Sequence, residues 1–164
     1  MKEGVHLGPI TTKKRLEEIE KLVEITKKEG AKILCGGKRP SGFNKGYFYE
    51  PTVMTDVPLN ARIMTEEPFG PVAPISSFND FESVVEEANR LPYGLAAYAY
   101  TKSAKTAEAI GSALESGMVS INHHGLAMPE TPFGGISDSG YGKEGGAEGI
   151  EAYFNSKFIT QTGL

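Results

Sequence analysis

Residues 95–122 read LAAYAYTKSAKTAEAIGSALESGMVSIN and decide the fold class. The apolar run over 95–100 predicts a buried strand, and Ser103 is placed to cap a helix that reaches residue 116. Ala107, Ile110 and Leu114 recur at helical spacing, and Gly117 ends that pattern before a second strand over 118–122. A helix between two short strands favours parallel pairing through a crossover, as in α/β proteins.

The same alternation of helices and strands extends toward the N-terminus. Thr12 can cap a helix over 12–29, because Leu16, Ile19 and Val23 fall on one face and Gly30 follows. Further elements are expected as a strand at 31–35, extended chain at 47–57, a helical turn at 61–67, a strand at 72–78 and a helix from 79 or 80 to 90. These elements predict an α/β layer architecture.

The character of the chain changes after Asn122. Residues 123–144 form a glycine-rich stretch that is too long for a simple connection, and such loops are usually functional or disordered. Residues 158–163 predict a short, polar terminal strand that pairs outside its own domain.

Composition excludes several classes of protein. The chain has 164 residues, 39% of them hydrophobic and 23% charged, which suits one ordinary globular domain. The net charge of −4 argues against a nucleic-acid binder, and no apolar run is long enough to span a membrane. The single cysteine favours a reducing cytoplasm.

The usual metal and nucleophile patterns are missing. His123 and His124 are adjacent, so on a strand their rings would face opposite ways, and we expect no metal site. Cys35 ends a strand that we predict to be buried, and we favour a small core residue there over a catalytic thiolate, because nothing local would activate the thiol.

Two stretches suit ligand binding, although each also has a simpler interpretation. Glu66 and Glu67 precede the rigid turn Pro68-Phe69-Gly70-Pro71. The turn would hold one carboxylate and the Phe69 ring in a fixed relation, as contacts to a nucleotide. In the simpler interpretation, both carboxylates are merely solvated. Phe133, between Pro132 and a Gly-Gly pair, is either a ligand wall or part of a surface connection.

Read together, these stretches resemble the C-terminal part of an NAD(P)-dependent aldehyde dehydrogenase, and most closely the succinate-semialdehyde dehydrogenase group. The matching pieces run in order along nearly the whole chain and include LGP at 7–9, EPTV at 50–53, EEPFGPV at 66–72, YGLAA at 93–97, PFGG at 132–135 and SGYG at 139–142.

The resemblance implies roles for individual residues. Glu67 would hold the nicotinamide ribose of NAD or NADP and Phe69 would pack near the nicotinamide, while Asn122, His123 and Phe133 would contact the substrate. It also implies a three-layer sandwich with a mostly parallel sheet over residues 1–153 and an oligomerisation strand within 154–164, through which the chain would form a homo-oligomer.

The departures from the family pattern bear on activity. The nucleophilic cysteine, the general-base glutamate, the oxyanion-binding asparagine and the nucleotide-binding domain would all lie upstream of this chain, and Cys35 matches none of them. We therefore expect the chain alone to be inactive and to bind cofactor weakly if at all, as a fragment, a split gene product that needs a separate N-terminal half, or a truncated frame. The alternatives are a self-associating module without chemistry and a small nucleotide-binding protein that uses Glu67 and Phe69.

An incomplete sheet has a further consequence. Apolar surface would remain uncovered, so we expect either oligomerisation or rearrangement of residues 122–144.

Overall fold

A computed structural model describes residues 5–43 and 45–163. The chain divides into two compact units, Met1–Phe78 and Asn79–Leu164, and each is described here by itself.

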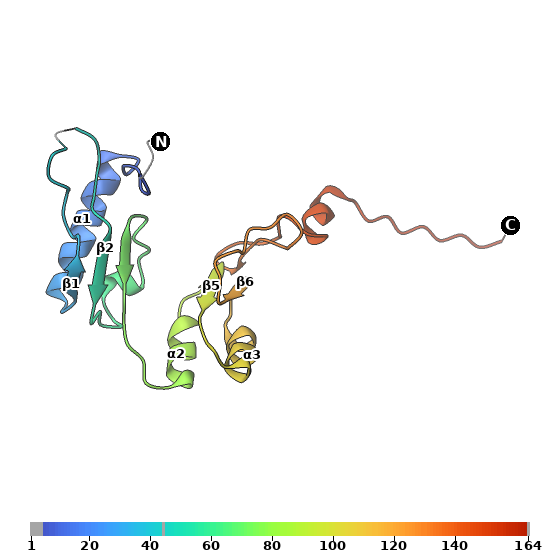
Figure 1. Ribbon diagram of the computed structural model, residues 1–164. Helices are drawn as coiled ribbons and strands as arrows, with labels where there is room; N and C mark the ends of the chain where they lie inside the picture. The colour runs from blue at the N-terminus through green and yellow to red at the C-terminus, as the bar shows by residue number, and fades with distance from the viewer. Residues whose placement is uncertain (1–4, 44, 164) are drawn as a thin grey trace. The chain divides into compact units, whose positions relative to one another are not determined.

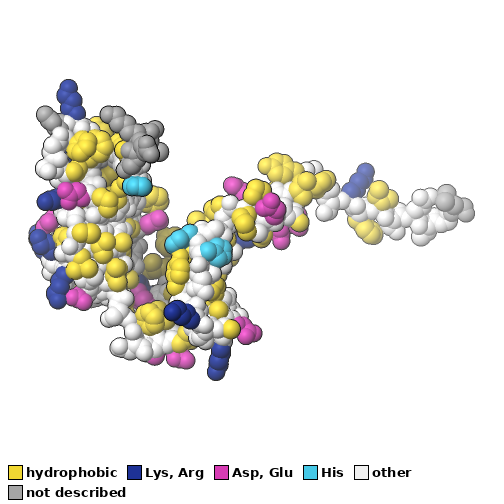
Figure 2. Space-filling view, viewed as in Figure 1, with side chains coloured by type: hydrophobic (Ala, Val, Ile, Leu, Met, Phe, Trp, Pro, Cys, Tyr) yellow, Lys and Arg dark blue, Asp and Glu magenta, His cyan; other side chains and the backbone are white. Residues whose placement is uncertain are grey.

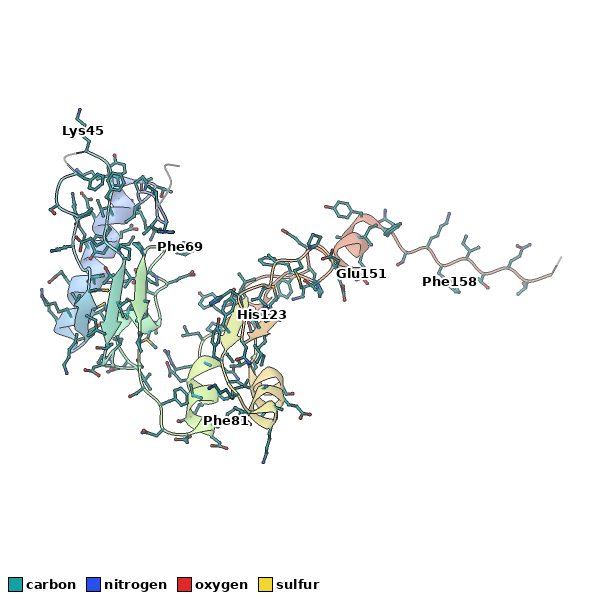
Figure 3. All side chains as sticks on the ribbon, viewed as in Figure 1. Lys45, Phe69, Phe81, His123, Glu151 and Phe158 are labelled. Carbon is teal, nitrogen blue, oxygen red and sulfur yellow. The ribbon has the colours of Figure 1, made fainter. Side chains whose placement is uncertain are left out.

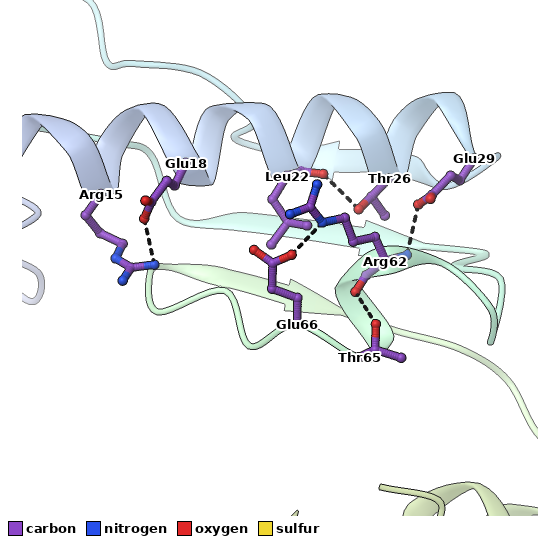
Figure 4. Close-up of polar contacts among 8 residues, drawn as sticks. All are labelled: Arg15, Glu18, Leu22, Thr26, Glu29, Arg62, Thr65 and Glu66. Carbon is purple, nitrogen blue, oxygen red and sulfur yellow. Dashed lines mark hydrogen bonds and ion pairs between the residues drawn. The ribbon is translucent and has the colours of Figure 1, made fainter.

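The first unit is organised around helix α1, Lys13–Lys28. The Thr12 side chain accepts a hydrogen bond from the Arg15 N–H at 3.1 Å, and Gly30 follows the helix with a φ of 119°. The helix buries the face that carries Leu16, Ile19, Leu22, Val23 and Thr26. The Thr26 hydroxyl donates to the Leu22 carbonyl at 2.9 Å, so this buried polar group is satisfied (Figure 4). The helix predicted over 12–29 is confirmed.

Helix α1 packs with a three-stranded sheet (Figure 1). The strands are β1 (Lys32–Cys35), β2 (Thr52–Thr55) and β3 (Val72–Pro74), in the order β1-β2-β3. Strand β1 pairs antiparallel to β2, and β3 pairs parallel to it. Met54 of β2 and Ile63 of the 3-10 helix η1 (Arg62–Met64) complete a core with the buried face of α1. Strand β2 begins directly after Pro51, because proline cannot donate to a sheet ladder.

The second unit contains the predicted strand–helix–strand crossover. Strand β5 (Ala96–Ala99) is followed by α3 (Ala104–Ala113) and β6 (Met118–Ile121). The strands pair in parallel, with Ala96 opposite Met118 and Ala99 opposite Ile121. The Ser103 side chain caps α3 by accepting from the Thr106 N–H at 3.2 Å. The parallel pairing predicted from residues 95–122 is confirmed.

The remaining elements of this unit are helix α2 and a second, very small sheet. Helix α2 (Phe81–Ala88) is capped by Asp80, and β4 (Tyr93–Gly94) pairs antiparallel with β7 (Ile136–Ser137). The 3-10 helix η2 (Glu148–Tyr153) precedes residues 154–163, which run as exposed, extended chain (Figure 1). The strand expected at 158–163 therefore has no β-pairing partner among the described residues.

The α/β class is confirmed, but the described residues do not form the single mostly parallel sheet of a three-layer sandwich. They form three small sheets, in which two pairings are parallel and two are antiparallel. Neither α2 nor α3 has a buried residue, and Tyr98 and Tyr100 of the strand predicted to be buried are 48% and 59% exposed. Among the described residues of the second unit, these elements leave much of their apolar surface exposed.

Cys35 also differs from the prediction. We expected a core residue, but its side chain is exposed. Strand β1 lies at the edge of its sheet, and the register shifts between Ile33 and Cys35, so that Leu34 and Cys35 are both exposed. The alternation that would have buried Cys35 is broken by this irregularity.

No helix within the described ranges is both long enough and apolar enough to cross a membrane.

Candidate functional site

The second unit contains a pocket of about 270 Å³ between the start of β6 and the loop that follows it. Its apolar walls are Met118, Val119, Leu126, Met128 and Pro132. Two glycines, Gly117 and Gly125, and the polar residues His123 and Thr131 complete the lining. The pocket is thus apolar with a few polar groups, which is typical of small-molecule sites.

Asn122 sets the direction in which the chain leaves β6. Its φ is 63°, a left-handed conformation that asparagine tolerates better than most residues. The amide oxygen accepts from the Thr101 N–H at 2.8 Å, and the amide nitrogen donates to the Thr101 carbonyl at 2.9 Å. The side chain therefore extends the β5–β6 ladder by one step, and Asn122 does not line the pocket.

His123, the next residue, does line the pocket. Figure 3 labels it in the second unit. Its Nδ1 accepts a hydrogen bond from the Gly125 N–H at 3.0 Å. Its carbonyl accepts from the Ser120 hydroxyl at 2.7 Å, and Ser120 is almost fully buried. These two bonds hold the residue and its ring in place from opposite ends.

His124 makes different contacts, and we did not select it from the sequence as a ligand-binding residue. Its Nε2 lies 2.7 Å from the Tyr100 hydroxyl. Its ring lies 5.4 Å from that of Tyr98 and 5.6 Å from that of Tyr100 between centroids. Tyr98 lies on β5 and Tyr100 directly follows its last residue, so the two side chains are spaced to share a face, and this spacing was the available signal. Figure 2 shows the two histidines of this unit at the surface, with hydrophobic side chains nearby.

The two histidines do not form a metal site together. One ring is bonded to the Gly125 N–H and the other to the Tyr100 hydroxyl. In the part of the chain that the structure describes, no three His, Cys, Asp or Glu side chains are grouped so that they could hold a metal ion.

The PFGG turn is fastened by Lys143, a residue that we did not single out from the sequence. Its ammonium group donates to the Gly134 and Gly135 carbonyls at 2.9 and 3.1 Å. Phe133 and Glu144 exchange backbone hydrogen bonds of 2.6 and 2.7 Å. Phe133 is half-buried and adjoins Pro132, but it is not among the residues that line the pocket.

Glu67 and Phe69 lie in the first unit, on the turn after η1. Glu66 is paired with Arg62, whose own N–H donates to the Glu29 carboxylate at 3.2 Å (Figure 4). Glu67 is exposed, and its carboxylate has no hydrogen-bond or ion-pair partner among residues 5–43 and 45–163.

The Phe69 ring is 67% exposed, and the Arg15 guanidinium lies 5.6 Å from its centroid. A free carboxylate and an accessible ring on one turn are chemically suited to ribose hydroxyls and a flat heterocycle, so these residues fit a nicotinamide cofactor. The structure brings Glu67 and Phe69 together on this turn, and it places Asn122, His123 and Phe133 in the other unit.

The sequence comparisons with known proteins cover nearly the whole chain and give one family. The model of the aldehyde dehydrogenase family matches residues 1–159. The chain is 41% identical over 162 residues to 4-(hydroxymethyl)benzenesulfonate dehydrogenase of Comamonas testosteroni, covering 97% of this chain and 33% of that protein. It is 42% identical over 158 residues to the chloroplastic betaine aldehyde dehydrogenase of Beta vulgaris, covering 96% and 32%. The NADP(+) succinate-semialdehyde dehydrogenase GabD of Escherichia coli is 40% identical over 156 residues, covering 95% and 32%.

Solved structures give the same result. Aldehyde dehydrogenase from Bacillus cereus matches with a TM-score of 0.87 at 40% identity, over 93% of this chain and 31% of that one. Betaine aldehyde dehydrogenase from Staphylococcus aureus in complex with NAD+ matches with a TM-score of 0.86 at 36% identity, over 92% and 30%. The chain spans about a third of the length of the curated relatives that it matches. From the match over residues 1–159, this chain belongs to the aldehyde dehydrogenase family.

Proposed function

We propose that this chain supplies the C-terminal part of the catalytic domain of an NAD(P)-dependent aldehyde dehydrogenase, which oxidises an aldehyde to a carboxylate in the cytoplasm. The observation that carries the proposal is the family match over 1–159, combined with coverage of only about a third of each relative. Activity then requires a polypeptide that supplies the nucleophilic cysteine, the general base, the oxyanion-binding asparagine and the nucleotide-binding domain.

The turn after η1 provides the chain's contact to the cofactor. The unpaired carboxylate of Glu67 accepts hydrogen bonds from the nicotinamide ribose, and the exposed ring of Phe69 packs near the nicotinamide. When bound, NAD(P)+ supplies the hydride acceptor. The ion pair between Arg62 and Glu66 and the bond from Arg62 to Glu29 hold the start of this turn against α1, so that Glu67 remains available.

The pocket beside β6 provides the chain's contact to the substrate. Its apolar walls accept the body of the aldehyde, and His123 meets it from the loop. Asn122 aims this loop through its two bonds to Thr101, and Phe133 closes the PFGG end of the substrate path. The resemblance and two relatives named for succinate semialdehyde make a carboxylated aldehyde the first substrate to test.

A complementation assay tests this function. The chain is mixed with a recombinant polypeptide that covers the N-terminal two-thirds of a relative, and NAD(P)H formation from succinate semialdehyde is recorded at 340 nm. We expect no turnover by either part alone and turnover by the mixture. Glu67→Gln should raise the apparent KM for the cofactor, whereas Glu24→Gln, at an exposed carboxylate of α1, serves as the control. Turnover by the isolated chain, or none by any mixture, would contradict the proposal.

A second function is favoured by residues 154–163. This segment is extended and exposed, with Phe158 90% and Ile159 74% exposed (Figure 3). Unpaired extended chain with apolar side chains is suited to adding a strand to a sheet of a second copy. We propose that the chain self-associates through this segment, whether or not it takes part in catalysis.

Sedimentation velocity tests self-association. We expect an oligomer for the full chain and a monomer after deletion of residues 158–164. The double variant Phe158→Ser, Ile159→Ser retains the length of the segment and should also dissociate. An oligomer that persists after the deletion would show that the interface lies elsewhere on the chain.

A further inference from the structure

We propose that His123 is a specificity-determining residue whose ring holds its proton on Nε2 and selects aldehydes with a hydrogen-bond acceptor, such as a carboxylate or sulfonate, at the end remote from the aldehyde. The inference rests on the proposed function, since it assigns a substrate class to the pocket beside β6.

The position of the ring proton follows from one hydrogen bond. The Gly125 N–H donates to His123 Nδ1 at 3.0 Å, so Nδ1 presents its lone pair there. A neutral imidazole carries one proton, which then resides on Nε2. Nε2 has no partner among the described residues, so its N–H is free to donate to a ligand.

Several other donors around the pocket are already in use. The Thr131 hydroxyl donates to the Met128 carbonyl at 3.1 Å. The lining peptide N–H groups that donate to backbone carbonyls are those of Gly117, Met118, Leu126, Met128 and Thr131. The Gly125 N–H is occupied by His123 itself. The Nε2–H of His123 is therefore the side-chain donor that the lining offers to a ligand.

The lining also disfavours a cationic ligand. Its nine described residues include no carboxylate and no Phe, Tyr or Trp ring. Quaternary ammonium groups are recognised by aromatic rings and by negative charge, and the described lining offers neither. The relatives named for succinate semialdehyde and for a benzenesulfonate have substrates with anionic groups, whereas others are named for betaine aldehyde.

Nuclear magnetic resonance on the full chain tests the inference without catalysis. At about pH 8, where a free imidazole is neutral, the ring nitrogen shifts of His123 report which nitrogen carries the proton. The chain is then titrated with succinate, with 4-methylbenzenesulfonate and with choline. We expect the proton on Nε2, saturable shifts of the His123 ring and the Gly125 amide with both anions, and none with choline.

Variants assign the effect to the ring proton. His123→Phe retains an aromatic ring but removes the donor, and we expect it to weaken succinate binding roughly tenfold or more. His123→Gln restores an N–H donor and should recover part of the affinity. His124→Phe is the matched control, because His124 contacts Tyr98 and Tyr100 and is not a lining residue.

The inference is overturned by a proton on Nδ1, by choline binding as tightly as succinate, by unchanged binding in His123→Phe, or by no saturable anion binding. A failed complementation assay contradicts the proposed function alone, since anion binding by the chain needs no second polypeptide. Turnover of the mixture with no anion preference would contradict the role of His123 alone.

Discussion

The two units of this chain have similar local structure but very different interiors. Both contain capped helices and parallel strand pairs. Among the residues that the structure describes, the first unit nevertheless contains ten of the twelve buried hydrophobic residues, and the second contributes only Ala99 and Met118. The comparison separates two properties of a sequence. Capping and spacing form helices and strands locally, whereas burial needs a second layer, which the first unit has and the second lacks.

The uncovered elements of the second unit are consistent with its origin in a larger domain. Tyr98 and Tyr100 are large side chains on a strand, and they are about half exposed. Exposed apolar groups of this kind mark surfaces that contact another polypeptide or another part of the same domain.

Truncation of one methionine in each unit gives the largest test of this comparison. Met54 is fully buried in the first unit, and Met118 is 7% exposed in the second. We expect Met54→Ala to lower the free energy of unfolding of the first unit by about 2–5 kcal/mol, because it removes buried volume from a packed core. Met118→Ala should cost less, since Ala99 is the one other buried hydrophobic residue among the described residues of its unit. Urea unfolding followed through resonances of each unit measures both, and equal losses would show that the second unit has a core of its own.

The pH dependence of stability offers a second test that is confined to the first unit. Burial raises the pKa of Tyr49 from 10.0 to about 12, and the nearby carboxylates of Glu20 and Glu24 add to the shift. A folded-state pKa above the unfolded value means that stability is complete below pH 10 and falls as the pH rises toward 12.

We expect a loss of roughly 2–3 kcal/mol over that interval. Unfolding midpoints across this range measure it, and Tyr49→Phe should remove this component. A dependence that persists in Tyr49→Phe would assign it to another group.

Two glycines of the second unit differ in how closely other atoms approach them, and substitutions there test how tightly this unit is packed. A Cβ at Gly117 would lie 1.9 Å from the Gly134 carbonyl oxygen, whereas the nearest atom to a Cβ at Gly111, in α3, would be 3.9 Å away. Gly117→Ala should therefore displace the PFGG turn, at a cost of about 1–3 kcal/mol. Gly111→Ala should stabilise α3 by about 0.5–1 kcal/mol. Amide hydrogen exchange near residues 117 and 134 and in α3 measures both effects. Unchanged exchange rates in Gly117→Ala would indicate that the turn is loosely packed.

The smallest expected effect concerns one carboxylate in each unit. The hydrogen bond from Arg39 lowers the pKa of Glu20, and hydrogen bonds from Ser83 lower that of Asp80. Each folded-state pKa lies below its unfolded value, so the stabilisation is present at neutral pH and is lost as the pH falls through the folded value.

Acid should therefore weaken the link between α1 and the residues around Arg39, and should fray the start of α2. Because the pair between Arg39 and Glu20 is partly exposed to solvent, we expect the Tm of the first unit to decrease by less than about 5 °C in Glu20→Gln. An acid titration followed residue by residue measures both carboxylates. A larger effect at high salt than at low salt would contradict an electrostatic origin.

The sequence predicted local structure well because its determinants are local. Thr12 and Ser103 were identified as helix caps, and each accepts the expected bond from a backbone N–H. For the helix expected from 79 or 80, the structure selects Asp80 as the cap. It predicted burial poorly for the strand with Tyr98 and Tyr100, because apolar composition does not tell whether a covering layer is present. Cys35 was missed for a different reason, since the register shift beside it leaves no mark in the residue types.

The candidate site was predicted in part. The family resemblance selected His123, and the structure places it at the pocket. It also selected Asn122, whose amide the structure shows bonded to the Thr101 backbone. Lys143 could not be found from sequence, because it bonds to backbone carbonyls that any residue would provide. The Gly125 N–H could not be found either, because every residue except proline carries this donor.

The anchoring of Lys143 has a chemical consequence. An amine engaged by two carbonyls holds its protons in fixed directions and presents little free lone pair to an electrophile. Acylating reagents that modify the chain's exposed lysines should therefore leave this one until last. The order in which the lysines are modified would show whether Lys143 keeps its bonds to the PFGG turn in solution.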